Sequence, residues 1–546
     1  MGLALFYLLH EFRGLATSQA MDQAQIGREL LAGHGWRTKV IRPLAFGELQ
    51  RNGRDATRAI WQDTYHAPLP PLLDAAALVV PVSASWDMTR DDIIYAGDRA
   101  IAIASILLFL ASVGVLYFIA LRLFDRRLAL LACGLVLVCD MMWQYSLSGL
   151  PQMLILLLLH LTIYALVRAI EKQSAGDSVR RWLTAAGLGF GLLALTHALT
   201  IWIFAPVLVI SVFYFRPRGW AAAILLGVFL ATYSPWLVRN YLVCGNPGGI
   251  AIYSALDGLQ HSEAGHMRRL DLDVDRIIPG AVRAKVRTNL VAQFNRLFEY
   301  LGWSIVAPVG FVSLLHVFKR RETVVMHWLL IAMWVGAVAG MAVFGINEEQ
   351  GVAANQFHML FTPLLTCYGL AFLLVQWSRL NLKHNILDVP FLVMLFLVCG
   401  LPMLFTMIFS TSAWRVRWPP YLPPSIAIIG EWMQPEEIVA SDMPWAVAWY
   451  ANRRSVWVPD TVQAFTDMHD FEKLGAPLKG LYLTPISGSE NKLGDLLSGE
   501  YREWTPYIVR IANLENFPLK WAVPHGPQEC VFFSDRDRRI PRRTQP

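Results

Sequence analysis

Charged residues are scarce in this chain, and their scarcity excludes an ordinary soluble fold. Asp, Glu, Lys and Arg together account for 16% of the 546 residues, whereas hydrophobic residues account for 55%. The mean hydropathy is +0.42. One or two soluble cores cannot enclose so much apolar surface. The composition therefore predicts an integral membrane protein.

Cysteine is also scarce. The chain has six cysteines, and four of them, Cys133, Cys139, Cys367 and Cys399, lie inside apolar runs. Only Cys244 and Cys530 lie in polar stretches, and nothing in the sequence brings these two together. Neither a disulfide framework nor a thiolate metal site is indicated.

A continuous basic face is absent as well, although the net charge is +6. This argues against a nucleic-acid partner. The basic residues instead form short clusters in every second loop between apolar runs, as cytoplasmic loops do. The loops at 12–98 and 239–299 and the tail after residue 411 are therefore predicted to be extracytoplasmic. The clusters are Arg122, Arg126 and Arg127; Arg168, Lys172, Arg180 and Arg181; Arg216 and Arg218; Lys319, Arg320 and Arg321; and Arg379 and Lys383.

Apolar runs near the length of a membrane span, about 20 residues, occur along the first three quarters of the chain. They predict a polytopic α-helical membrane protein with about eleven transmembrane helices, the first of them too short to span. The candidates are Met1–His10, Arg99–Leu123, Leu128–Met142, Leu150–Val167, Trp182–Leu199, Ile201–Phe215, Trp220–Leu237, Tyr300–Phe318, Val324–Phe344, Phe357–Trp377 and Leu387–Phe409.

The composition changes after residue 411. "WPPYLPP" at 418–424 is typical of a stiff linker, and beyond it "IVASD", "SVWVP", "GLYLTP" and "VFFSD" predict short strands. We therefore expect a transmembrane domain at 1–411 and a soluble extracytoplasmic α/β domain at 412–546. "PWAVAWYA" predicts a helix whose Trp445, Trp449 and Tyr450 either pack on the sheet, the commoner use, or stack on sugar rings.

The first outer loop is far longer than a connection requires. A helix is predicted from near Met21, with Asp22, Gln25 and Glu29 on one face, lying in the membrane surface with its carboxylates in water. Further on, the three prolines of "HAPLPPLL" are expected to prevent a regular helix and to hold Asp63 and His66 at a rigid corner.

These features together resemble the GT-C membrane glycosyltransferases, in particular the dolichyl-phosphate-mannose protein mannosyltransferase and aminoarabinose transferase group. The stretches that carry the resemblance are "MDQAQIGRELLAGHGW" (21–36), "HAPLPPLL" (66–73), "LRLFDRRLALLA" (121–132) and "SPWLVRNYLVCGNP" (234–247). It covers roughly two thirds of the chain, to about Trp377. The first-loop acid followed by Gly-His-Gly is its most specific part.

The resemblance implies transfer of a sugar from a polyprenyl phosphate, with inversion at the anomeric carbon. It also implies that the donor lies in the outer leaflet of a bacterial inner membrane. It implies that Asp22 activates the acceptor or helps to hold a divalent metal. Such a reaction needs a base and a cation for the leaving phosphate, and Arg42 and Arg239 are the candidates for the cation. An arginine at the end of a span also commonly reaches toward lipid head groups, and Asp22 also suits a helix N-terminus. His66 is either an acid, base or ligand or a turn-stabilising residue, and Asp63 is expected to help shape the site.

One departure concerns the next outer loop, "QYSLSGLPQML" (144–154), which lacks the second acid usual in the family. Asp140 is the candidate substitute, because a charge within a span is costly, although solvation at a helix end explains it equally. With one carboxylate, a divalent metal at Asp22 has few ligands, and the cofactor is left open. At the outer edge of the tenth span, Glu348, Glu349, Gln356 and His358 either line the donor pocket or are ordinary loop residues.

The expected function is therefore transfer of a sugar from a polyprenyl-phosphate donor to a lipid, glycan or protein acceptor on the extracytoplasmic face. The partners would be membrane lipid, the lipid-linked sugar and an acceptor that the sequence does not identify. A transporter or flippase is the rival from another class, but it is less consistent with polarity gathered in outer loops and with dissimilar halves. A catalytically silent GT-C scaffold that binds lipid-linked sugar is the second rival.

Overall fold

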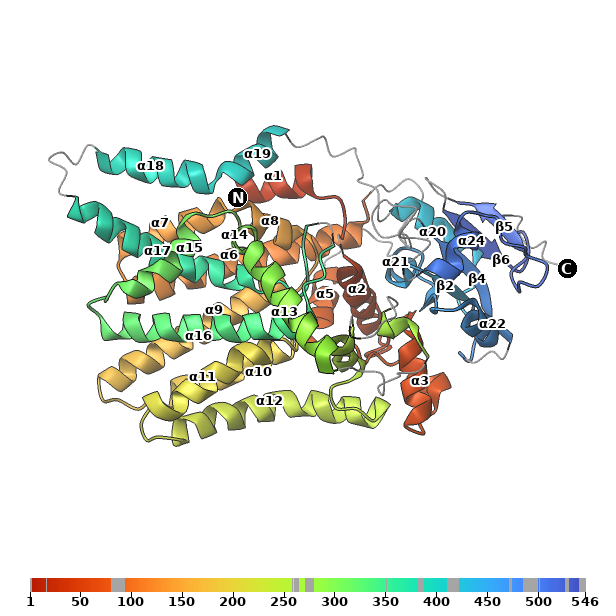
Figure 1. Cartoon of the computed structure of the whole chain (residues 1–546), viewed down its shortest axis with the longest axis horizontal. Coiled ribbons are helices and arrows are strands. Elements are labelled where there is room, and N and C mark those ends of the chain that lie inside the picture. Colours follow the sequence, from red (N-terminus) through yellow and green to blue (C-terminus); the bar gives the residue numbers. More distant parts are fainter. Residues whose placement is uncertain are drawn as a thin grey trace.

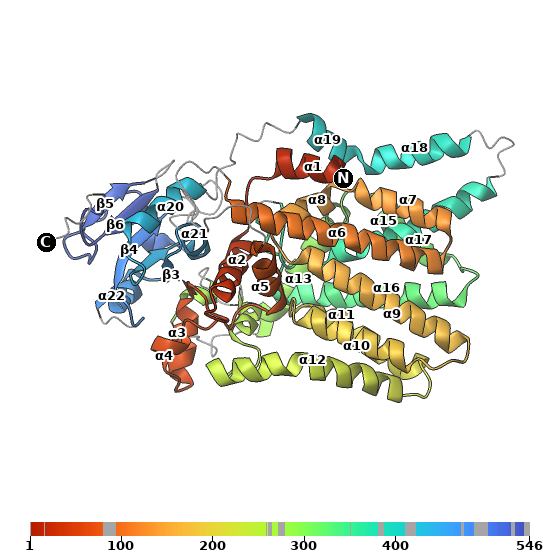
Figure 2. The same cartoon turned by 180° about the vertical axis from the view of Figure 1, so that it is seen from behind.

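The computed structural model describes residues 2–15, 17–79, 94–257, 259, 265–270, 279–349, 351–380, 387–409, 422–470, 474–484, 499, 501–525 and 530–539. A bundle of long helices occupies one end of the molecule and a sheet with short helices occupies the other (Figure 1). The view from behind shows the same division, with two helices of the first outer loop, α2 (Ser18–Leu31) and α5 (Leu69–Leu78), between the two parts (Figure 2).

Five helices in the described part of the chain are long and apolar enough to cross a membrane. Two bent pairs raise the number to seven if each pair is one span. The pairs are α7 (Arg126–Leu137) with α8 (Asp140–Leu147), bent by 58°, and α18 (Asp388–Cys399) with α19 (Leu401–Phe409), bent by 57°. The five are α6 (Ala96–Leu123), α9 (Gln152–Ser174), α12 (Trp220–Cys244), α16 (Arg321–Phe344) and α17 (His358–Arg379). The prediction of a helical, polytopic architecture is thus confirmed.

The other four predicted spans also contain helix, but in shorter pieces. They are α1 (Gly2–Phe6) with the π-turn η1 (Tyr7–Glu11), α10 (Arg180–Ala194), α11 (Thr200–Tyr214), and α15 (Val306–Val312) with η5 (Ser313–Leu315). A helix rises about 1.5 Å per residue, so these pieces are shorter than a bilayer core. The count of eleven spans stays a prediction.

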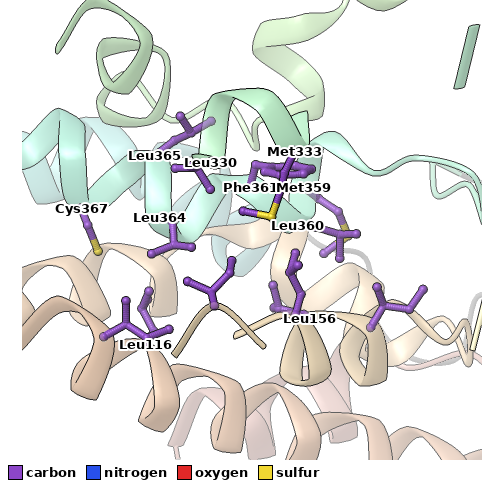
Figure 3. Close-up of a cluster of buried hydrophobic side chains, with 14 of the residues drawn as sticks. Leu116, Leu156, Leu330, Met333, Met359, Leu360, Phe361, Leu364, Leu365 and Cys367 are labelled. Atoms are coloured by element: carbon purple, nitrogen blue, oxygen red, sulfur yellow. The ribbon is translucent and has the colours of Figure 1, made fainter. Parts of the chain in front are cut away.

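The core of the bundle is formed by apolar side chains from helices far apart in the sequence. Leu116, Leu156, Leu330 and Leu364 are buried there (Figure 3). Two glycines allow α15 and α17 to approach closely: a Cβ on Gly369 would lie 2.0 Å from the carbonyl oxygen of Val306, and one on Gly310 would lie 2.5 Å from that of Leu365. Small residues at a crossing permit backbone contact between membrane helices.

The sheet has six strands in the order β1-β3-β2-β4-β6-β5. β1 to β4 are mutually parallel, and β6 and β5 add an antiparallel edge. The strands are β1 (Val40–Ile41), β2 (Ile438–Ser441), β3 (Arg454–Trp457), β4 (Leu478–Leu483), β5 (Trp521–Pro524) and β6 (Val531–Ser534). The four predicted strands and the helix that begins at Pro444 are confirmed, whereas β5 was not predicted. The expected boundary near residue 411 lies outside the described residues.

The edge strand β1 comes from the first outer loop. Val40 pairs with Ser455 and Ile41 with Val456, both in the parallel sense. Sequence reasoning did not predict this pairing. The sheet therefore joins the first outer loop to the C-terminal part of the chain and does not stand apart as an appended module.

Helix α2 corrects one prediction. Its residues from Ala20 to Glu29 are all buried, because the helix packs against α5 on one side and α21 (Pro444–Tyr450) on the other. Arg28 donates hydrogen bonds to the carbonyl oxygens of Ala448 and Trp449, at 2.7 and 2.9 Å. The prediction that its carboxylates face water was wrong, since an amphipathic pattern identifies the polar face but not what that face meets.

Helix α5 corrects a second prediction. Pro70 and Pro71 lie in its first turn, after Pro68 at the N-cap. The first backbone N–H groups of a helix have no intrahelical acceptor, so proline costs nothing there. The three prolines start a helix instead of preventing one. The corner predicted at Asp63 and His66 is present just before it.

The remaining helices are short or lie in the outer loops. They are α3 (Pro43–Arg51), α4 (Ala56–Ala59), η2 (Ile250–Leu256), η3 (His266–Arg268), α13 (Pro279–Asn295), α14 (Leu297–Tyr300), α20 (Pro423–Trp432), α22 (Val462–Asp470), η8 (Arg502–Trp504) and α24 (Thr505–Ile508).

Candidate active site

A cavity of about 500 Å³ lies where the helical bundle, the first outer loop and the sheet meet. Asp22, Arg42 and His66, three residues predicted to be functional, all line it. Bundle residues close the opposite wall. The side chains discussed below come from five places in the sequence: Asp22, Arg42 and His66; Tyr233 and Trp236; Asp257; Glu349; and Trp445 and Trp457.

Asp22 lies on the buried face of α2, one turn after the helix begins, and both of its oxygens have partners. Oδ2 accepts a hydrogen bond from Arg42 at 2.6 Å, and Oδ1 accepts one from the Gln25 amide at 3.0 Å. Gln25 in turn donates to Thr38 at 2.8 Å and accepts from the backbone N–H of Lys39 at 2.9 Å. The carboxylate is therefore held in one orientation by the helix and by the chain entering β1.

Arg42 directly follows β1, so the pairing of β1 with β3 determines where its side chain begins. Its guanidinium lies 3.7 Å from the ring centroid of Tyr65, a cation–π contact that also holds it in place. The side chain is 9% exposed, so its charge is felt strongly within the cavity. A buried arginine beside a carboxylate is a ready partner for a phosphate, to which it can donate two parallel hydrogen bonds.

His66 and Asp63 form a second buried pair next to Asp22. Asp63 accepts hydrogen bonds from the backbone N–H of His66 at 3.1 Å and lies 3.3 Å from its Nδ1. Burial alone would raise the pKa of Asp63. The charge and hydrogen bond of His66, with further help from Arg42 and Arg239, outweigh burial and hold that pKa below its ordinary value.

A second carboxylate, Glu349, lines the same cavity. Its two oxygens accept hydrogen bonds from the backbone N–H of Ser18 at 2.7 Å and from the Ser18 hydroxyl at 2.6 Å. Glu349 thus caps the start of α2, one turn before Asp22, where a helix favours negative charge. Burial raises the pKa of Glu349 above its ordinary value, although both hydrogen bonds from Ser18 oppose the rise.

Sequence reasoning named both Glu348 and Glu349 as possible lining residues, and of the two only Glu349 is among the described residues that line the cavity. Both follow the same span in a non-helical stretch, and the signal for an acid at this edge was present in "NEEQ". No hydrophobic period runs through such a stretch, so nothing in the sequence distinguishes the two positions. Glu348 points the other way and forms an ion pair with Arg296 at 2.6 Å.

The carboxyl ends of three parallel strands meet at the cavity. Arg42 follows β1, Trp457 ends β3, and Trp445 comes shortly after β2. In open sheets of parallel strands, ligands bind at this edge. The sheet therefore provides one wall of the site, a relationship that the sequence did not reveal.

Arg239 is not among the described residues that line the cavity. It donates hydrogen bonds to the carbonyl oxygen of Asp63 and to Oδ1 of Asn240, the latter at 3.1 Å. Its guanidinium also lies 4.7 Å from the ring centroid of Trp236. These contacts place it behind the corner that carries His66, where it holds the loop backbone.

Asp140, Gln356 and His358 are also outside the described cavity lining. Asp140 accepts hydrogen bonds from the hydroxyl of Tyr7 and from Gln144, the latter at 2.5 Å. These two bonds satisfy both oxygens of the buried carboxylate. Gln356 donates to the carbonyl of Tyr300 at 2.9 Å, and His358 accepts from Trp334 at 3.1 Å. Both residues are buried in the bundle, so the lining comes from neighbouring residues of the same loop.

The described residues around Asp22 do not fit a divalent metal ion. Within the described ranges, no group of three or more His, Cys, Asp and Glu side chains converges as ligands. Moreover, the Asp22 oxygen that faces His66 already accepts a hydrogen bond from the cationic Arg42, which would repel a metal ion.

The fold is that of polytopic membrane glycosyltransferases. The chain superposes on ArnT from Cupriavidus metallidurans bound to undecaprenyl phosphate with a TM-score of 0.55, at 12% identity, covering 98% of this chain and 96% of that one. It also superposes on the oligosaccharyltransferase AglB from Archaeoglobus fulgidus, in complex with an inhibitory peptide and a dolichol-phosphate, with a TM-score of 0.53. That match has 10% identity and covers 99% of this chain and 74% of the other.

Residues 91–238 match the family model for dolichyl-phosphate-mannose-protein mannosyltransferase. No curated protein is significantly similar to the chain in sequence. The resemblance to this group of membrane glycosyltransferases, predicted from the first outer loop and the spans that follow it, is confirmed.

Proposed function

We propose that this protein transfers a sugar from a polyprenyl-phosphate donor to an acceptor hydroxyl on the extracytoplasmic face of the membrane. The observation that carries the proposal is the meeting of Asp22, His66 and Arg42 in one cavity at the end of the bundle that adjoins the sheet. The structural neighbours, solved with undecaprenyl phosphate and with dolichol-phosphate, support a lipid-phosphate donor.

The reaction would be a single displacement with inversion. Asp22 accepts the proton of the acceptor hydroxyl while the hydroxyl oxygen forms a bond to the anomeric carbon of the donor. The bond from that carbon to the phosphate oxygen breaks, and polyprenyl phosphate leaves with the electron pair. Arg42 stabilises the charge that develops on the phosphate.

The ion pair between Arg42 and Asp22 suggests how donor binding prepares the base. Arg42 contacts one carboxylate oxygen of Asp22 at 2.6 Å. A donor phosphate would compete for the guanidinium and would free that oxygen to accept the hydroxyl proton when the sugar is in place. His66, within 3.6 Å of Asp22, would complete the polar contacts to the reacting hydroxyl. We assign Arg239 to positioning the His66 corner.

We further propose that the bundle has eleven spans within residues 1–411, that 412–546 form the extracytoplasmic α/β domain, and that the membrane is a bacterial inner membrane. The basic residues support this orientation. Arg122 and Arg168 pair with Glu171 at 3.1 and 2.6 Å, at the ends of α6 and α9 that lie away from the sheet (Figure 1). Cytoplasmic loops carry such clusters.

The test of the base is Asp22→Asn in the full-length, membrane-inserted protein. We expect transfer from a labelled polyprenyl-phosphate sugar to fall by about 10²-fold to 10⁴-fold. Asp55→Asn is the matched control, since Asp55 is an exposed acid of the same loop and Asn caps a helix equally well. Unchanged sugar transfer by Asp22→Asn would refute the assignment of Asp22 as the base. A silent scaffold would bind the lipid and release no polyprenyl phosphate in any variant.

The orientation has a separate test. All six native cysteines are buried, so a cysteine introduced at the exposed Arg58 reports the side of the first loop. A membrane-impermeant thiol reagent should label Arg58→Cys in intact cells and should label Ser178→Cys, at the opposite end of the bundle, only after lysis. The reverse pattern would remove the lipid-linked donor from reach and refute the proposal.

A further inference from the structure

Two tryptophans from the C-terminal part of the chain face the cavity that contains Asp22. Trp445 lies in the first turn of α21 and Trp457 ends β3, and both are half-buried. Their ring centroids are 5.3 Å apart and their planes are nearly perpendicular, at 86°. This edge-to-face pair forms part of the cavity wall.

The other aromatic residues of α21 are engaged elsewhere. Trp449 and Tyr450 donate hydrogen bonds to the two carboxylate oxygens of Asp98, at 2.7 and 2.9 Å. They therefore anchor the helix to the start of α6. Of the three aromatic residues that recur along this helix, two pack as structural residues, and Trp445 alone is on the cavity side.

Trp457 is held in position before any ligand binds. Its Nε1 donates a hydrogen bond to the hydroxyl of Tyr501 at 3.0 Å, and the ring of Tyr501 is covered by Arg268 at 3.7 Å. With the indole N–H already bonded, Trp457 offers the cavity its aromatic surface. A preorganised aromatic surface loses little conformational entropy on binding.

Carboxylates line the same cavity as this aromatic pair. Asp22, Glu349 and Asp257 line the same cavity, and each is an acceptor for hydroxyl groups. An apolar ring face beside several hydroxyl acceptors matches a pyranose, whose C–H groups pack on an aromatic ring while its hydroxyls donate to carboxylates.

The position of the pair distinguishes acceptor from donor. The lipid of a polyprenyl donor must reach the cavity from the bundle, which lies in the membrane. Trp445 and Trp457 belong to α21 and β3, which lie with the sheet at the other end of the molecule (Figures 1 and 2). We propose that Trp445 and Trp457 form the acceptor subsite and that the acceptor is a carbohydrate presenting a pyranose ring. This inference rests on the proposed function, because it takes the cavity as the place of transfer.

The test uses the full-length protein in lipid nanodiscs and saturation-transfer difference NMR. The probes are methyl α-D-mannopyranoside, methyl β-D-glucopyranoside and methyl N-acetyl-β-D-glucosaminide, with the peptide N-acetyl-Gly-Ser-Gly-amide as comparator. We expect saturation of the ring C–H protons of at least one glycoside. The signal should fall at least about fivefold in Trp445→Ala and Trp457→Ala, and it should persist in Trp521→Ala, which removes an exposed tryptophan of β5.

Trp445→Phe and Trp457→Phe guard against misfolding, since each keeps an aromatic ring and should retain part of the signal. The inference is overturned if no glycoside binds the wild-type protein, if Trp445→Ala and Trp521→Ala bind glycoside equally, or if only the peptide binds. Release of polyprenyl phosphate by the wild-type protein is measured in the same preparation. Release without glycoside binding refutes the subsite alone, whereas glycoside binding without release refutes the proposed transfer.

Discussion

The Nε2 atom of His66 lies 3.6 Å from the Oδ2 atom of Asp22 and has no hydrogen-bond partner among the described residues, although it is buried. The opposite nitrogen, Nδ1, faces Asp63. A buried polar atom without a partner calls for an explanation. Here the Nε2 atom lies beside the carboxylate proposed as base, so that one acceptor hydroxyl could contact both groups.

Asp63→Asn should change the pH dependence of stability. The pKa of Asp63 is held below its ordinary value, so its carboxylate contributes stability above the unfolded pKa, about 3.9, and loses it as the pH falls through the folded value. We expect the wild type to exceed Asp63→Asn in free energy of unfolding at neutral pH, with the difference shrinking below about pH 4. Thermal unfolding between neutral and acid pH measures it, with the exposed Glu436→Gln as control. A difference that grows on acidification would contradict the ion pair.

Arg42→Gln should destabilise the protein, because it leaves the charge of Asp22 buried without its partner. Removing one member of a buried pair costs about 3–5 kcal/mol. The double variant with Asp22→Asn should recover much of that stability but no transfer activity. Denaturation and transfer assays on both single variants and the double variant form a mutant cycle. Additive effects on stability would show that the two groups do not interact.

Glu349→Gln should reduce transfer without abolishing it. The change removes the charge that holds Ser18 and the start of α2, so Asp22 is positioned less rigidly. We expect a loss of stability of about 1–2 kcal/mol and a lower kcat with little change in KM for the donor. Glu348→Gln is the adjacent control, because its partner Arg296 is on the exposed surface and such pairs contribute about 0–1 kcal/mol. Equal effects at the two positions would refute the positioning role.

Trp449→Phe should weaken the junction between the sheet and the bundle. It removes the hydrogen bond to Asp98 and leaves one buried carboxylate oxygen without its donor, at a cost of about 1–3 kcal/mol. Limited proteolysis should then cleave between the bundle and the sheet faster than in the wild type. Trp521→Phe, at an exposed position, should behave as the wild type. An unchanged proteolysis rate in Trp449→Phe would mean that other contacts suffice.

The site could be predicted only in part. Asp22, Arg42 and His66 were identified because they lie in one stretch of the first outer loop with a recognisable pattern, and the structure brings all three to the cavity. Asp140 was proposed because a charged side chain within a span is costly in free energy, but Tyr7 and Gln144 donate hydrogen bonds to both of its oxygens. The free-energy cost of burying a charge does not by itself distinguish a catalytic carboxylate from one that is buried and hydrogen-bonded.

By itself the sequence determined the helical spans and most of the strands, because burial in lipid or in a core acts on each residue and leaves a hydrophobic period along the chain. Only the tertiary structure decided the composition of the cavity. The pairing of Val40 with Ser455, the turn of Glu349 toward Ser18 and the placement of Trp445 in one cavity lining with bundle residues all join distant parts of the chain. Contacts of this kind depend on which surfaces of the folded chain meet. The hydrophobic period of a local segment carries no information about that.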